Sequence, residues 1–341
     1  MFSRFDYGLV SVSPRLGGEN SLNFLKEFDM KRDLSFLSIF VFSVAVVATN
    51  AQLRLPRPSQ WASVTQTIGV TDITINYSRP AVKGRPIFGE VSENDNYVKG
   101  EATLDDQYKR PKDMVIVPYG HVWRTGANEA TQFITTDDVL INGQKLPAGK
   151  YSLHTVPGKD EWTIIFNSDA GQWGSFDYDA SKDVLRVKTK PQWVNDNQEL
   201  LLYSFEPTAD NATNVNIRWE KVRVPFTVQV DVVATTLAKA KKAVAEAKPD
   251  DWRTPFQAAG YAKQNKDMSD AGAWLDAALK AVDISIAAKP TFQNLSAKTN
   301  MLLNAGRKDE ALATADKAIA QGKADKADTA AFEKRIADLK A

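Results

Sequence analysis

The spacing of apolar residues changes once along this chain, and that change constrains the fold more than any other feature. Up to residue 233 apolar side chains alternate with polar ones in short runs, whereas from Thr235 onward they recur every three to four positions among many alanines. Alternation is typical of β-strands, and the longer period is typical of amphipathic helices. The sequence therefore predicts a β domain over 53–233 and a helical domain over 235–341, with the boundary near Ala234.

Composition excludes several classes of function. The chain carries 43 Lys and Arg against 42 Asp and Glu, a formal net charge of +1, and no cysteine. A nearly neutral chain has no electrostatic reason to bind nucleic acid or an anionic membrane. Without cysteine there is no disulfide, thiolate nucleophile or Cys-ligated metal, so packing alone must stabilise the fold. We expect no cofactor.

A secretory signal peptide is predicted at residues 30–51. Met30 is followed by Lys31 and Arg32, then by the apolar run 34–47 and a small-residue cleavage site that ends at Ala51. The run of about fourteen residues is shorter than the ~20 that span a membrane. We therefore expect an exported protein, periplasmic or extracellular, with no transmembrane anchor in the mature chain. Residues 1–29 are interpreted as a spurious extension upstream of the true start.

The β domain carries clear turn signals. Gln66 to Tyr77 alternates as one half-buried strand and runs into a loop rich in proline and basic residues. Asn142 and Gly143 form the residue pair that a type I′ hairpin turn requires. A second hairpin is predicted around 157–160, and a polar surface insertion at 92–113. Further short strands are predicted at 184–189, 200–205, 215–219 and 225–233.

Because no helical pattern separates these strands, they predict an antiparallel sandwich or barrel. The blocks YSRPAVKGRPIFG at 77–89, VPYGHVWRTGANEAT at 117–131 and LPAGKYSLHTVPG at 146–158 closely resemble the bacterial secreted family catalogued as domain of unknown function 2911. The resemblance covers nearly all of 77–233, and it implies a mostly β, exported domain of unassigned activity. The polar insertion departs from the family pattern, and so does His121, which stands where the family has lysine or another polar residue.

Helix signals divide the second domain into six segments. Thr254 and Pro255 suit the N-cap and first position of a helix, while Gly306 and Gly322 suit C-terminal stops. The predicted helices are 237–248, 255–264, 270–288, 292–304, 309–321 and 329–340.

The stretch LLNAGRKDEALATADKAI resembles a tetratricopeptide unit, with Ala311 and Ala318 at small positions, and an echo lies some forty residues earlier. We interpret the domain as tetratricopeptide-like and suited to a protein partner. A helix stripe at Trp274 and Val282 is better explained as helix-pair core than as a ligand surface.

Candidate ligand contacts gather in the segment RTGANEA, where a sandwich needs only a turn. Arg124 follows Trp123, so on a strand the indole faces the core and the guanidinium faces the open side. A guanidinium suits a carboxylate, a phosphate or a sugar acid. The alternative is an internal ion pair between Arg124 and Glu129. The candidate ligand-binding residues are Arg124, Asn128, Glu129, His154, Arg79, Lys83 and Arg85.

No metal site is predicted, because the two histidines, His121 and His154, lack the repeated ligand spacing of zinc sites. His154 lies on the strand face opposite Leu153, where simple exposure would explain it. Ser152 shares that face without a nucleophile elbow, so a serine triad is not predicted either.

The sequence favours a binding module for a small molecule, a glycan or an envelope component, with a helical domain for protein contact. One alternative is a secreted hydrolase that pairs Glu129 with Asp169, Asp177 or Asp179. Another is a purely structural envelope protein. An enzyme should lose turnover on Glu129→Gln with its folding intact, whereas a binding module should tolerate that change.

Cleavage after Ala51 gives the first testable prediction. N-terminal sequencing of the exported protein should begin at Gln52 or at its cyclised form, because the small residues at 49–51 match a signal-peptidase site. A mature chain that retains Met30 would contradict it.

Overall fold

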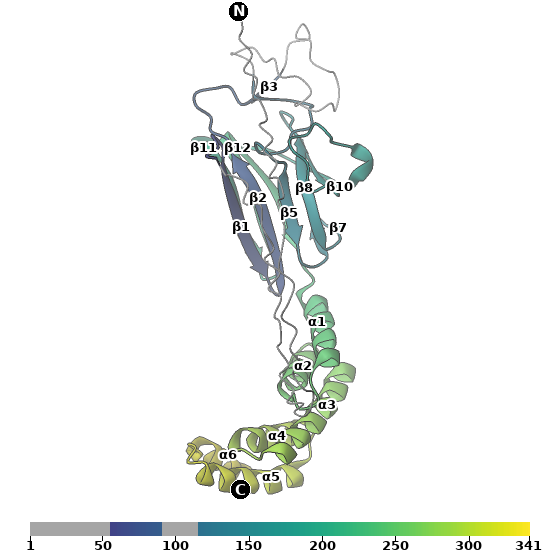
Figure 1. Ribbon diagram of the computed structural model, residues 1–341, viewed down its shortest axis with the longest axis vertical. Helices are drawn as coiled ribbons and strands as arrows, with labels where there is room; N and C mark the ends of the chain where they lie inside the picture. The colour runs from purple at the N-terminus through teal and green to yellow at the C-terminus, as the bar shows by residue number, and fades with distance from the viewer. Residues whose placement is uncertain (1–54, 91–114) are drawn as a thin grey trace, which may run out of the picture. The chain divides into compact units, whose positions relative to one another are not determined.

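The computed structural model of the protein describes residues 55–90 and 115–341. The predicted signal peptide at 30–51 and the polar insertion at 92–113 lie outside the described residues. The described residues form a β domain and a helical domain, in chain order (Figure 1).

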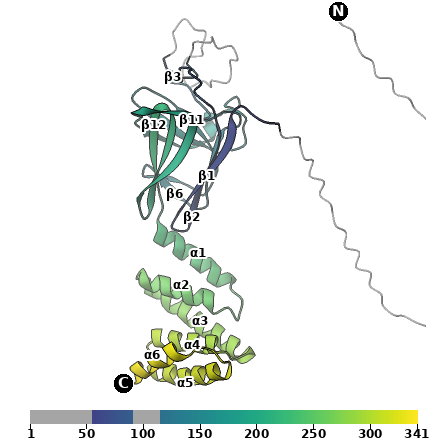
Figure 2. The same ribbon diagram turned by 90° about the vertical axis from the view of Figure 1, so that its left-hand side faces the viewer.

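Two antiparallel sheets form the β domain (Figures 1 and 2), which confirms the sandwich among the predicted alternatives. A short parallel pair, β3 (Phe88–Gly89) and β4 (Val117–Pro118), accompanies them. The first sheet has the order β1 (Gln60–Ile68), β2 (Thr71–Arg79), β5 (Thr131–Thr135), β8 (Gly149–Val156), β9 (Trp162–Asn167) and β10 (Asp183–Thr189). The second has the order β11 (Gln192–Ala209), β12 (Ala212–Gln229), β6 (Val139–Ile141) and β7 (Gln144–Leu146).

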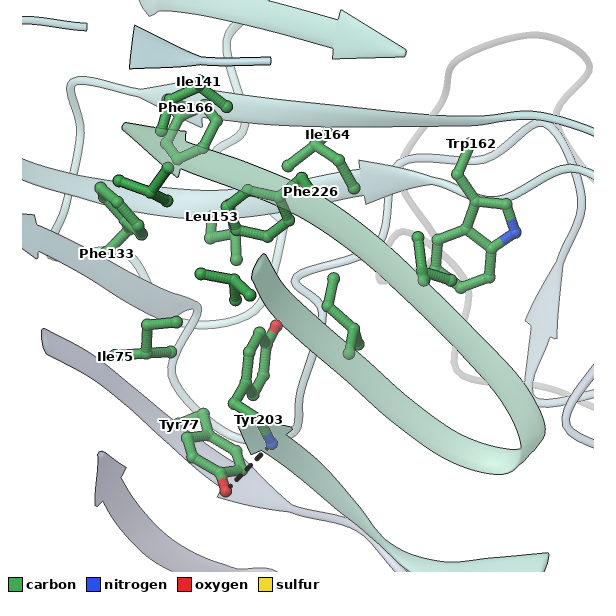
Figure 3. Close-up of a cluster of buried hydrophobic side chains, with 14 of the residues drawn as sticks. Ile75, Tyr77, Phe133, Ile141, Leu153, Trp162, Ile164, Phe166, Tyr203 and Phe226 are labelled. Carbon is green, nitrogen blue, oxygen red and sulfur yellow. Dashed lines mark hydrogen bonds between the residues drawn. The ribbon is translucent and has the colours of Figure 1, made fainter. Parts of the chain in front are cut away.

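The inward-facing side chains of both sheets make one core (Figure 3). Ile73 and Ile75, predicted to share a face, are fully buried, and Tyr77 is 4% exposed. The Tyr77 hydroxyl accepts a hydrogen bond from the backbone N–H of Tyr203 at 3.2 Å, so it is satisfied inside the core. Phe133 packs edge-on against Phe166 with ring centroids 5.0 Å apart. Apolar burial of this kind is the main driving force for a sandwich.

Both predicted hairpins are confirmed. Asn142 and Gly143 have φ values of 46° and 81°, and β6 pairs with β7 directly across them. β8 pairs with β9 across the predicted second turn.

Two strand predictions were wrong. The segment Gln66 to Tyr77 is the end of β1, a turn and most of β2, because Gly69 has a φ of 62° and reverses the chain. β11 and β12 are single strands of 18 residues each rather than several short ones. β12 pairs with β11 as far as Arg223 and with β6 from Val228, so Pro225, which has no N–H, lies where the partner changes.

Six helices follow the sandwich, as predicted. They are α1 (Val232–Glu246), α2 (Arg253–Gln264), α3 (Met268–Ala288), α4 (Phe292–Asn304), α5 (Lys308–Ala324) and α6 (Ala330–Lys340).

Two helix-end predictions were wrong. The carboxylate of Asp251, not the side chain of Thr254, accepts from the first backbone N–H groups of α2, because the helix begins at Arg253. Gly322 lies inside α5, where a Cβ would come within 2.4 Å of Thr329, so its small size serves packing rather than termination.

Two helix pairs repeat the same turn. Lys266 after α2 and Gly306 after α4 both have positive φ, at 63° and 73°. In both turns the next residue donates its N–H back into the preceding helix, Asp267 to Ala262 O at 2.9 Å and Arg307 to Leu302 O at 2.9 Å. The predicted stop at Gly306 is thereby confirmed, and a third turn of this kind follows α5, where Lys326 has a φ of 55° and Ala327 donates its N–H to Gly322 O at 2.8 Å. Trp274 and Val282 are buried in the helix-pair core, as predicted.

Gly69 also packs against Val232, the first residue of α1. The second prediction follows from this contact. A Cβ on Gly69 would lie 2.5 Å from Cγ1 of Val232, and the positive φ adds backbone strain. We expect Gly69→Ala to lower the free energy of unfolding by about 2–3 kcal/mol, measured by chemical denaturation.

Gly143→Ala is the matched control, because Gly143 has a similar φ of 81° but no neighbouring atom within 4 Å of its Cβ position. Gly143→Ala should lower the free energy of unfolding only by the backbone strain, about 1 kcal/mol. Equal losses in the two variants would show that the contact with Val232 contributes nothing.

Candidate functional site

One row of side chains across the outer face of the six-stranded sheet is polar on every strand. Leu153 of β8 is buried in the core, so alternation places Ser152 and His154 on the outer face. Cross-strand partners point to the same face. The register from β1 to β10 gives the row Ser63, Asn76, Gln132, Ser152, Asn167 and Asp183.

A covering loop (residues 168–182) folds over half of this row. The side chain of Gln132 donates to the carbonyl of Ala170 at 2.8 Å, and Gln172 donates to the hydroxyl of Ser152 at 3.4 Å. Ser152 and Asn167 are consequently fully buried. Within this row only Ser63 is exposed, and Asn76 and Gln132 are half-buried.

Asp183 fixes the end of the covering loop through three side chains. Its carboxylate accepts hydrogen bonds from the Tyr178 hydroxyl at 2.7 Å, from Arg186 Nε at 2.7 Å and from Asn167 Nδ2 at 2.8 Å. Burial raises the pKa of Tyr178 above its usual value, and the carboxylate of Asp183 raises it further. The phenol therefore keeps its proton and acts as a donor to Asp183 at neutral pH.

The structure places His154 beneath this loop, and the expectation of an exposed side chain was wrong. His154 is fully buried, with its ring centroid 5.1 Å from that of Tyr178. Its strand face was predicted correctly, but the loop that closes over that face is not visible in the strand pattern. His154 therefore contributes to the packing under the loop rather than to an open surface.

The 124–129 segment (residues 124–129) lies at the edge of the covering loop. Trp123 is 5% exposed and belongs to the core, as predicted, whereas Arg124 is half-buried. Thr125 and Asn128 both have positive φ, at 50° and 59°. The Thr125 carbonyl accepts hydrogen bonds from the Thr131 hydroxyl at 2.8 Å and from the Tyr203 hydroxyl at 3.0 Å. This segment is therefore held in its conformation by both sheets.

Arg57 joins the 124–129 segment to the covering loop. Its Nη1 contacts the two carboxylate oxygens of Glu129 at 2.6 and 2.8 Å, and its guanidinium lies 5.3 Å from the ring centroid of Trp173. The backbone of Gly174 donates to the carbonyl of Asn128 at 3.0 Å. Asn128 also donates its side-chain amide to the Ser78 hydroxyl at 3.2 Å. Asn128 and Glu129 are thus gathered with Arg57 and Trp173, two residues that were not predicted.

The basic loop (residues 79–85) makes its described contacts within the scaffold and not with the 124–129 segment. Arg79 Nε donates to the carbonyl of Leu201 at 2.9 Å, and Arg85 donates to the carbonyls of Ala81 and Val82 at 2.6 and 3.1 Å. Two of the three predicted basic contacts therefore bind backbone carbonyls. The Lys83 side chain remains exposed at the turn. None of the hydrogen bonds or ion pairs described for this loop runs to the 124–129 segment.

Two carboxylates of the covering loop lie in settings that favour the ionised form. Lys182 donates to Asp169 at 3.0 Å and lowers the pKa of that carboxyl. The hydroxyl and backbone N–H of Ser181 lower the pKa of Asp179. A general acid for glycoside hydrolysis needs a raised pKa, so neither group suits that role. Within 55–90 and 115–341, no three His, Cys, Asp or Glu side chains are grouped to hold a metal ion.

In the comparisons with known proteins, only the β domain has a match. A family model described as "Protein of unknown function (DUF2911)" matches residues 59–228, which span β1 to β12 and include the covering loop. No curated protein and no solved structure was found to match the chain.

The third prediction concerns Arg57. The Arg57 guanidinium contacts both Glu129 and Trp173. Arg57→Ala should therefore lower the free energy needed to open the covering loop by about 1 kcal/mol and speed amide exchange at Gly174 roughly fivefold. Hydrogen exchange measured by NMR would report this residue by residue.

Lys145→Ala is the matched control, since it removes an exposed ion pair with Asp138 on the other sheet, 2.8 Å in length. Exchange at Gly174 should not change in that variant. If Arg57→Ala also leaves this amide unchanged, Arg57 does not hold the loop.

Proposed function

The chain belongs to the protein family of unknown function DUF2911, and we propose that it is an exported binding protein. In this proposal the β domain binds a small molecule or a glycan that carries an acidic group, and Arg124 is the anchoring residue. The helical domain contacts a protein partner.

The observation that carries the proposal is backbone strain in the 124–129 segment. Thr125 and Asn128 are non-glycine residues with φ values of 50° and 59°, and they lie three positions apart. Such residues cost of order 1 kcal/mol or more each and persist where the surrounding structure imposes them. Turns such as that at Asn142 also carry one such residue, but the 124–129 segment carries two within four positions, and strain of this kind collects at ligand-binding and catalytic sites.

The chemistry of the segment favours an acidic ligand. Glu129 accepts two hydrogen bonds from Arg57, a residue outside the segment. A guanidinium at Arg124 offers a planar set of donors that matches a carboxylate or a phosphate. The neighbouring Asn128 amide is held by Ser59 and Ser78 and can orient a ligand without adding charge.

Export and partner binding are the less direct parts of the proposal. Export rests on the predicted signal peptide at 30–51. Among the described residues, no helix combines the length and the apolarity needed to cross a membrane. A protein partner for the tail is supported by its repeated helix pairs, since stacked helical repeats commonly present surfaces to other proteins.

The fourth prediction tests Arg124. In a thermal-unfolding screen of acidic sugars and acidic metabolites, at least one compound should stabilise the full chain, by about 2.7 kcal/mol at a hundredfold excess over its Kd. Arg124→Ala should lose that stabilisation while it unfolds near the parent temperature without ligand. Arg124→Lys should lose most of it, because an ammonium cannot form the bidentate contact.

Arg223→Ala is the control, since Arg223 pairs with Glu206 on the other sheet and should leave ligand stabilisation intact. If both Arg124 variants unfold early and no acidic compound stabilises the parent protein, Arg124 is scaffolding and the binding proposal fails.

A further inference from the structure

We propose that the open part of the outer face, between Trp61 and Trp173, is a platform that binds the rings of a neutral oligosaccharide chain. This inference rests on the proposed function and deepens it, because it names a glycan as the ligand and two tryptophans as its contacts. Neither tryptophan belongs to the 124–129 segment.

Trp61 stands on the outer face at the start of β1. It pairs with Ser78 of β2, whose neighbour Tyr77 points into the core, so Trp61 and Ser78 share the outer face. The side chain of Trp61 is 55% exposed although it is among the largest apolar groups of the chain. An indole left open on a sheet face is the unusual observation, because large aromatic rings are mostly buried.

Trp173 stands on the same side, in the covering loop. It forms an isolated antiparallel bridge with Glu129 and is 51% exposed. The Arg57 guanidinium lies over its ring at 5.3 Å and restrains the indole from one side. A restrained aromatic ring loses little conformational entropy on binding, which favours its use as a ligand contact.

A chain of contacts links the backbones of the two tryptophans. Asn128 links them, since its amide donates to Ser78, the partner of Trp61, and its carbonyl accepts from Gly174, the neighbour of Trp173. The path crosses at most three strand spacings, so the two backbones lie within about 15 Å of each other. This span suits a few linked sugar rings.

The register row beside Trp61 is polar and has no charged side chain on β1, β2 or β5. Ser63 is exposed, while Asn76 and Gln132 are half-buried in the same register row. Arg57 and Glu129, which lie beside Trp173, form an ion pair with each other. Hydroxyl and amide groups both donate and accept hydrogen bonds, as sugar hydroxyls require.

This mixture favours a sugar over an apolar protein surface. A protein-binding hot spot is a well-packed, desolvated cluster with further apolar groups around it. Here the residues that link the two tryptophans are Ser78 and Asn128, and the Arg57–Glu129 ion pair lies beside Trp173. A sugar ring presents an apolar C–H face to an indole and its hydroxyls to the polar groups beside it, so it fits both components.

The fifth prediction is a binding assay on the full chain by isothermal titration calorimetry. The probes are neutral hexasaccharides of glucose, xylose, mannose and N-acetylglucosamine, with glucuronic acid as the acidic arm. At least one hexasaccharide should bind, and Trp61→Ala and Trp173→Ala should each weaken it about tenfold. Trp173→Tyr should recover most of the loss, because it keeps an aromatic face.

Trp193→Ala is the matched control. Trp193 is 56% exposed but lies on β11 of the other sheet, so its loss should leave oligosaccharide binding unchanged. The platform is overturned if no hexasaccharide binds, or if the three alanine variants bind equally well. Binding of glucuronic acid that depends on Arg124, without any hexasaccharide binding, would overturn the platform and leave the proposed function standing. If neither the hexasaccharides nor glucuronic acid bind, both the platform and the proposed function are overturned.

Discussion

The stacking of Trp123 on Trp219 is the contact on which the described site depends. The two indoles lie 5.7 Å apart and nearly parallel, at 18°, and they come from opposite sides of the sandwich. Phe88 packs edge-on against both, and against Trp162 of β9 at 5.1 Å. Aromatic pairs of this geometry contribute about 0.5–1.5 kcal/mol each beyond their burial. In a chain without cysteine, such packing joins the two sheets where other sandwiches use a disulfide.

The position of Trp123 in this cluster dictates the course of the residues that come after it. Its indole is anchored in the core, and the chain turns immediately after it through Thr125, a fully buried residue with a positive φ of 50°. The carbonyl of Thr125 is held by Tyr203 from the second sheet and by Thr131 from the first. Packing energy in the aromatic cluster thus sustains backbone strain at the buried residue next to it, which is how strained positions generally persist.

The sequence predicted what depends on near neighbours. Alternation gave the correct face for Ile73, and the pair Asn142 and Gly143 identified a turn, because both signals act within a few residues. Gly69 was an available signal that was missed, since a glycine inside an alternating run often marks a turn or bulge. His154 shows the limit of this approach, because its face follows from the strand period whereas its burial depends on a loop that begins fourteen residues later.

Contacts that cross the chain could not be predicted in this way. Arg57 reaches Glu129 across 72 residues, and no local pattern distinguishes it from the other arginines of the chain. Gly322 looked like a helix stop because glycine commonly ends helices, but its lack of a side chain is needed where Phe292 and Thr329 approach α5. A small residue can serve backbone freedom or close packing, and only the tertiary structure decides between them.

The pairing of Arg57 with Glu129 also explains how one surface can serve both acidic and neutral parts of a ligand. If Glu129 were uncompensated, its negative charge beside the 124–129 segment would repel a sugar acid or a phosphate. With both of its oxygens bound by Arg57, the carboxylate is neutralised locally and Trp173 is held by the same guanidinium. A glycan could then present an acidic group towards Arg124 and lay its neutral rings along β1 and β2. Arg57 would thus set both the charge and the shape of the surface.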